Sequence, residues 1–148
     1  MSINNSTTRA STLGFRIAVL CAAVGMIVGM LMAGSHNHAV MPAHAHLNLL
    51  GWVSLFLFSI FYKLHPGADV TLLAKIQVIT WACGAVVMAT GVGLIYTGHA
   101  MGEPLASTGS VAVLIGLGLF IKVVYAETST KRIAQEMDAV AKAAVAGR

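Results

Sequence analysis

Four long apolar stretches divide the chain, and they predict its secondary structure. They cover about residues 14–34, 43–62, 73–97 and 111–125, and short polar segments separate them. Runs of roughly 20 predominantly apolar residues are typical of transmembrane α-helices. The fourth stretch is the shortest, but Lys122 can extend its ammonium group from it to the membrane boundary. The pattern therefore predicts an all-α, polytopic membrane protein with a four-helix transmembrane domain over residues 13–126.

The two ends of the chain have a different composition. Residues 1–12 are rich in Ser, Thr and Asn, which predicts a disordered N-terminal segment. Residues 127–148 carry apolar positions at helical spacing, and Asp138 and Lys142 form a favourable i,i+4 pair. We expect this tail to form a short amphipathic C-terminal helix on the cytoplasmic side.

Composition agrees with a membrane protein. Hydrophobic residues make up 57% of the 148 residues and charged residues only 9%, whereas about a quarter of the residues in soluble domains are charged. The formal net charge is +4, but the basic residues flank the apolar stretches, so they indicate contact with anionic lipid rather than with nucleic acid. Cys21 and Cys83 both fall inside predicted helices, where we expect them to pack as small apolar side chains.

Lys and Arg are distributed unevenly between the connecting segments. They occur at or before the start of the first helix, in and beside the connection between the second and third helices, and at or after the end of the fourth. The other two connections have none. The positive-inside rule then places both termini in the cytoplasm of a bacterial-type inner membrane. Five of the six histidines fall at the outer face in this topology: His36, His38, His44, His46 and His99. Ionisable groups near bilayer depth are costly, so this gathering is the strongest functional signal in the sequence.

His44 and His46 lie in the first turn of the second predicted helix, just after Pro42. Two residues apart on an α-helix, their side chains project about 200° from each other, so they cannot bind one ion from one face. They can offer one imidazole to each of two sites. His44 shares its face with Asn48, Gly51 and Leu55, and the small Gly51 leaves room for a flat ligand. His46 shares its face with apolar residues (Leu50, Val53 and Leu57).

This geometry favours haem. A bis-imidazole haem needs one histidine on each side of the ring and an apolar slot between helices. The chain has no CxxCH motif, so the haem b would be bound non-covalently, with His44 and His46 as iron ligands. The candidates for hydrogen bonds to the ligands or to the propionates are Asn48, His36, His38 and His99.

Two other interpretations stay open. The outer histidines, together with Met41 and Met101, form a set of imidazoles and thioethers that suits copper, so the chain could be a copper-binding or copper-handling protein. Alternatively, it is a small assembly or interaction subunit without a cofactor, in which the histidines are incidental.

The sequence His44-Ala-His46-Leu-Asn48-Leu-Leu-Gly51-Trp-Val53 resembles the ligand-bearing helix of the catalytic subunit of haem–copper oxidases, especially the cbb3-type and nitric oxide reductase branches. That family has twelve spans in three arcs of four, and one of its helices carries two histidines that serve different haems. The resemblance implies that three copies of this chain could form a homotrimer, with each haem between His44 of one copy and His46 of the next.

The chain departs from that family in ways that matter for function. It has no His-Pro-Glu-Val-type copper helix, and two histidines on one haem would leave no open iron position. Enzymatic activity is therefore an open question, and oxygen or nitric oxide reduction is not expected. We expect electron transfer or haem-based sensing. The partners expected are membrane lipid, further copies of the chain, and a redox protein or a quinone.

Overall fold

The computed structural model describes residues 8–146, and from residue 130 onwards it describes the side chains of residues 134 and 137 only. Within these residues the chain is all-helical, as predicted. Its elements are α1 (Ala10–Ser35), α2 (Met41–His46), the π-helix η1 (Leu47–Ser54), α3 (Leu55–Leu64), α4 (Pro66–Asp69), α5 (Leu72–Tyr96) and α6 (Gly102–Ala146). Among the described residues, four helical segments are long and apolar enough to cross a membrane: Ala10–Ser35, Met41–Leu64, Leu72–Tyr96 and Gly102–Ser129. The prediction of four such helices is confirmed.

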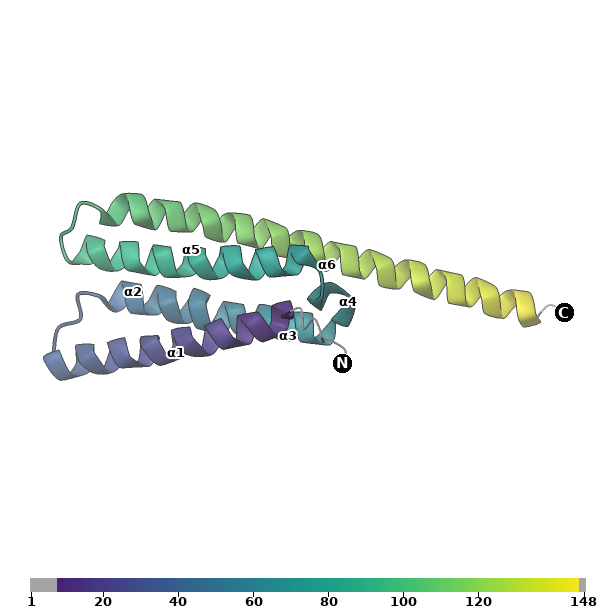
Figure 1. The fold of residues 1–148 in the computed structure, drawn as a ribbon, viewed down its shortest axis with the longest axis horizontal. Coiled ribbons are helices and arrows are strands. Elements are labelled where there is room, and N and C mark those ends of the chain that lie inside the picture. Colours follow the sequence, from purple (N-terminus) through teal and green to yellow (C-terminus); the bar gives the residue numbers. More distant parts are fainter. Residues whose placement is uncertain (1–7, 147–148) are drawn as a thin grey trace, which may run out of the picture.

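The helices form two antiparallel hairpins. In Figure 1, α1 lies beside the second span, which consists of α2, η1 and α3, and α5 lies beside α6. Helix α5 also packs against α1 and the second span, so it joins the two hairpins. The turns that carry His36, His38 and His99 lie at one end of the bundle. The start of α1, the short α4 and the C-terminal part of α6 lie toward the other end.

Glycines hold α5 and α6 at close range. A Cβ added to Gly109 of α6 would overlap the backbone of Met88, and one added to Gly91 of α5 would overlap the backbone of Ala106. Small residues allow transmembrane helices to approach until their backbones are in van der Waals contact. The α5–α6 hairpin is therefore fixed by backbone packing along its length.

Aromatic side chains connect the hairpins at the end of the bundle near α4. Phe58 of α3 contacts Trp81 of α5 and Phe120 of α6, with ring centroids 4.7 Å and 4.2 Å apart. The fully buried Tyr62 donates its hydroxyl proton to Oε1 of Gln77, 3.0 Å away. These contacts make this end a packed core of rings with a buried polar pair inside it.

Asp69 of α4 fixes the beginning of α1. Its carboxylate accepts hydrogen bonds from the backbone nitrogen of Ser11 (2.7 Å) and from the Ser11 hydroxyl (2.8 Å), and Asp69 is only 1% exposed. The side chain of Arg9, at the N-cap position, makes no capping hydrogen bond. The Asp69 carboxylate, distant in sequence, therefore caps the helix at the positive end of its dipole. Residues 10–12 are consequently helical, which differs from the predicted disordered segment. Residues 1–7 of that segment lie outside the described residues.

Helix α6 begins at Gly102, earlier than the predicted start near residue 111. Polar residues gave this segment the composition of a loop, but their side chains form hydrogen bonds within the helix. Thr108 donates to the Pro104 carbonyl, and Ser110 donates to the Ala106 carbonyl. At the other end, the predicted separate C-terminal helix is a continuation of α6. Its predicted amphipathic face falls mostly on side chains outside the described ones.

Candidate functional site

The second span changes its helical geometry just after the two histidines. The α-helix α2 ends at His46, and residues Leu47–Ser54 form the π-helix η1, whose hydrogen bonds run from i to i+5. The Leu50 carbonyl accepts a hydrogen bond from Nε1 of Trp81 at 3.0 Å, and the Ser54 hydroxyl donates to the Leu49 carbonyl at 2.7 Å. Two carbonyl groups of the π-helix thus accept hydrogen bonds from side chains. π-Helical turns frequently occur at functional sites, and the hydropathy pattern gave no signal for this one.

His44 lies in a notch on α1 formed by two glycines. A Cβ placed on Gly29 would lie 3.1 Å from Cε1 of His44, and one on Gly25 would lie 2.5 Å from Oδ1 of Asn48. Gly25 and Gly29, which are one helical turn apart on α1, therefore make room for these two polar side chains of the second span.

Asn48 holds His44 from within the same helix. Its amide nitrogen donates to the His44 carbonyl at 2.8 Å and lies 3.3 Å from Nδ1 of the His44 ring. The ring contact is at the long end of hydrogen-bond geometry, so it is the weaker of the two. Because the amide nitrogen is a donor, the ring nitrogen that faces it presents a lone pair.

The face predicted to contain His44, Asn48, Gly51 and Leu55 packs toward the inside of the bundle. Gly51 is buried, and a Cβ on it would lie 3.0 Å from Sγ of Cys21 on α1. Leu55 is fully buried in the core. The structure thus gives Gly51 a contact with a neighbouring helix of the same chain, whereas its predicted role was clearance for a ligand.

His46 has a different environment. Its Nδ1 lies 2.7 Å from the carbonyl oxygen of Pro42. A carbonyl can only accept, so Nδ1 must carry the proton, and the lone pair of a neutral ring is then on Nε2. His46 is half-buried, and Val53 and Leu57, assigned to its face by the sequence, are exposed, Leu57 to 58%. This side of the second span therefore faces away from the bundle.

The remaining predicted residues lie in the turns at the same end. His36 and His38 are exposed in the turn after α1, and His36 adopts a left-handed conformation with φ of 53°. His99 is exposed and its Nδ1 lies 3.0 Å from the hydroxyl of Thr97. No group of three or more His, Cys, Asp or Glu side chains able to hold a metal ion occurs within the part of the chain that the structure describes.

No family model, curated protein or solved structure matches this chain. The functional proposal therefore depends on the chemistry and geometry of the residues themselves.

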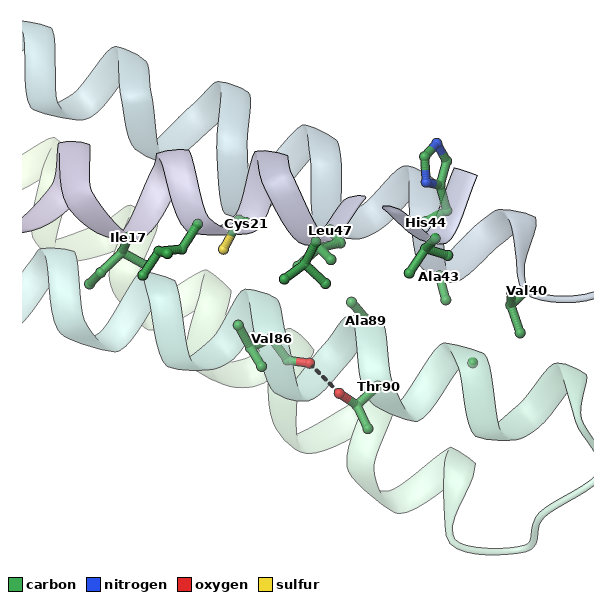
Figure 2. Close-up of a pocket in the computed structure, with 13 residues that line it drawn as sticks. Ile17, Cys21, Val40, Ala43, His44, Leu47, Val86, Ala89 and Thr90 are labelled. Atoms are coloured by element: carbon green, nitrogen blue, oxygen red, sulfur yellow. Dashed lines mark hydrogen bonds between the residues drawn. The ribbon is translucent and has the colours of Figure 1, made fainter. Parts of the chain in front are cut away.

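A cleft of about 530 Å³ lies next to His44, between α1, the second span and α5. Its lining is almost wholly aliphatic, and the polar groups along it are those of Cys21, His44 and Thr90. The Thr90 hydroxyl donates to the Val86 carbonyl at 2.9 Å (Figure 2), so its proton is already bonded. Figure 2 also shows the imidazole of His44 pointing away from α5. The sequence did not predict this cleft, although the small residues Ala43, Ala89 and Gly93 along it are the features that leave it open.

Proposed function

We propose that this chain is an integral membrane protein that binds haem b through the imidazoles of His44 and His46. The observation that supports it best is the hydrogen bond from Nδ1 of His46 to the Pro42 carbonyl. Histidines that bind metals almost always donate their other ring N–H to a carbonyl or carboxylate, which fixes the ring and its tautomer. His46 has this arrangement, with Nε2 free for iron.

The surroundings of His46 also fit a large, flat and apolar ligand. The ring is half-buried, and exposed aliphatic side chains continue along the same side of the helix. A haem needs such an apolar surface beside its iron ligand. In a membrane-spanning helix this surface would otherwise face lipid, so a second protein surface can cover it without disturbing the bundle.

His44 is the second ligand in this proposal. Its ring is near an amide donor at a long distance, and binding iron would replace that weak contact with a strong bond. Asn48 would act as a positioning residue, because its stronger hydrogen bond goes to the His44 backbone and holds the turn that carries the ring.

The two rings project from opposite sides of α2, so they cannot bind the same iron within one chain. We therefore place each haem between His46 of one copy and His44 of the next. In a closed ring of three copies, every haem site has both of its histidines, and all the interfaces are of one kind. The exposed apolar side of the second span, which includes Val53 and Leu57, would then be buried between protomers.

In the proposed role, haem supplies one-electron redox chemistry, and the protein supplies ligand orientation, burial and hydrogen bonds. Two imidazoles on each iron favour electron transfer or redox sensing over reactions that need an open iron position. The distribution of Lys and Arg supports an inner-membrane topology with cytoplasmic termini, in which this site would lie near the outer face.

The experiment is an absorption spectrum of the purified chain, oxidised and reduced. We expect sharp reduced α and Soret bands of low-spin haem, and loss of those bands in His46→Ala and in His44→Ala. His65→Ala is the matched control, because Nδ1 of His65 also bonds to a carbonyl, that of Phe61 at 2.7 Å, but at the other end of the same span. This variant should retain the full spectrum.

Several results would overturn the proposal. Protein purified from haem-replete membranes with no haem and with stoichiometric copper would favour the copper-binding alternative. A full low-spin spectrum in His46→Ala would show that His46 is not an iron ligand. Carbon monoxide binding to the reduced protein would show an open iron position and exclude two histidine ligands. A haem-containing monomer in detergent would exclude the site between copies.

A further inference from the structure

The cleft between the two hairpins is bounded by two close contacts. On the side toward α4, Nε1 of Trp81 bonds to the Leu50 carbonyl, which brings α5 against η1. Near the histidine-bearing end, α5 approaches α2, where a Cβ on Gly93 would lie 3.4 Å from Cβ of Ala43. Between these contacts α5 contributes the small residue Ala89 to the lining, and a space of about 530 Å³ remains.

The cleft has a buried floor and an exposed rim. Cys21 of α1 and Ala89 of α5 are each only 6% exposed, whereas Leu20 and Val24 on α1 are 65% and 50% exposed. Val86 and Thr90 of α5 are also exposed and line the same cleft. The opening is therefore sideways, between α1 and α5, along helices that are long and apolar enough to span a membrane.

We infer that this cleft binds a single hydrocarbon chain that enters from the bilayer. Its volume lies within the range of about 300–1,000 Å³ found for ligand pockets. No charged side chain lines it, the Thr90 hydroxyl is already bonded to a carbonyl, and the His44 imidazole points away from α5 (Figure 2), so a polar head group would find little to bind. Water is disfavoured for the same reason, because a buried water needs two to four polar partners.

A hydrocarbon chain satisfies both the chemistry and the access. It needs no hydrogen bonds, it can enter from the side, and it fills space that would otherwise leave the apolar lining without contacts. The acyl chain of a phospholipid and the tail of an isoprenoid share this chemistry. The inference does not depend on haem, since the imidazole of His44 points away from α5 (Figure 2).

The two cysteines allow a direct test. Cys21 lies on the floor of the cleft, whereas Cys83 is exposed elsewhere on α5 and does not line it. The full chain would be reconstituted with a phosphatidylcholine that carries a diazirine in one acyl chain, or with a diazirine-labelled isoprenoid. After extraction into detergent and removal of loose lipid, the sample would be irradiated and the adducts mapped by mass spectrometry.

We expect adducts on Cys21 and its neighbours from one or both probes, and little labelling at Cys83. The probe that labels Cys21 identifies the source of the chain. Ala89→Phe should lower the Cys21 adduct roughly tenfold, since a ring on the floor occupies the space of the ligand. Cys83→Phe is the matched control and should leave the adduct unchanged.

Equal labelling of Cys21 and Cys83, or full labelling of Cys21 in Ala89→Phe, would overturn the inference. Ala89→Leu is a second, milder variant if the phenylalanine variant does not fold, and it should reduce labelling in part. Loss of haem from Ala89→Phe, together with no lipid adduct on Cys21 in the parent chain, would identify the macrocycle as the occupant and would also overturn it. Absence of haem in every variant would refute the proposed function and leave this test intact.

Discussion

Nε1 of Trp81 lies 3.0 Å from the carbonyl oxygen of Leu50, across 31 residues of sequence. The bond joins α5 to the π-helical part of the second span, where the hydrogen-bonding pattern differs from that of an α-helix. It therefore connects the irregular segment that follows the two histidines to the rest of the bundle.

Trp81→Phe should lower the free energy of unfolding by about 0.5–1.5 kcal/mol, because it removes the indole hydrogen bond to the Leu50 carbonyl. Thermal unfolding in detergent, followed by circular dichroism, would measure the effect. Trp52 is exposed, so Trp52→Phe is the matched control and should change stability little. Equal effects of the two substitutions would show that the bond does not contribute.

Gly109→Ala should separate α5 from α6, because the added Cβ would overlap the backbone of Met88. Overpacking of this kind typically lowers the free energy of unfolding by about 1–3 kcal/mol. In the same helix, a Cβ on Gly118 meets nothing within 4 Å, and Gly118→Ala should leave stability unchanged or raise it. Comparable melting temperatures for both variants would contradict the close packing of this hairpin.

Asp69→Ala should loosen the start of α1, because the Ser11 amide and hydroxyl would lose their acceptor. We expect a loss of about 1–3 kcal/mol in the free energy of unfolding. Hydrogen exchange of the first turn of α1 should also become faster than in the parent chain. Glu103→Ala, which removes an exposed carboxylate from the first turn of α6 at the other end of the bundle, is the control and should leave hydrogen exchange at the start of α1 unchanged.

His36→Gly should stabilise the chain by up to about 1–2 kcal/mol, because glycine adopts a positive φ such as the 53° of His36 without the steric penalty of a side chain. His38→Gly, in the same turn, has no positive φ to relieve and should not stabilise. The same two variants test the predicted contact with haem propionates. A shift of the haem midpoint potential in His36→Gly alone would assign His36 to that contact, and no shift in either variant would exclude both histidines.

Asn48→Ala should weaken haem binding about 10- to 100-fold, the usual effect of removing a side chain that positions a metal ligand. Titration of the haem-free chain with haem would measure it. Ser54→Ala removes another side-chain bond to a carbonyl of the same span and should leave affinity unchanged. Unchanged affinity in Asn48→Ala would show that His44 needs no support from Asn48.

The sequence predicted the existence and order of the spans well, because hydropathy is a property of each stretch by itself. The predicted helix boundaries were less accurate where a polar side chain forms a hydrogen bond only in the folded protein. Thr108 and Ser110 looked like loop residues, but they bond to carbonyls of their own helix. Likewise, residues 10–12 looked disordered, but Asp69 caps the helix that they begin, 58 residues away.

For the site, the sequence by itself determined that His44 and His46 lie in the first turns of one helix and project to opposite sides. It also determined that His44 shares its face with Asn48, Gly51 and Leu55. These features follow from helical periodicity, which is local. Only the tertiary structure decided which neighbours these faces meet. His44 and Asn48 enter the notch at Gly29 and Gly25, the second span becomes π-helical after His46, and a cleft remains between the hairpins. The physical reason is that each depends on the volumes and hydrogen bonds of side chains brought together from separate helices.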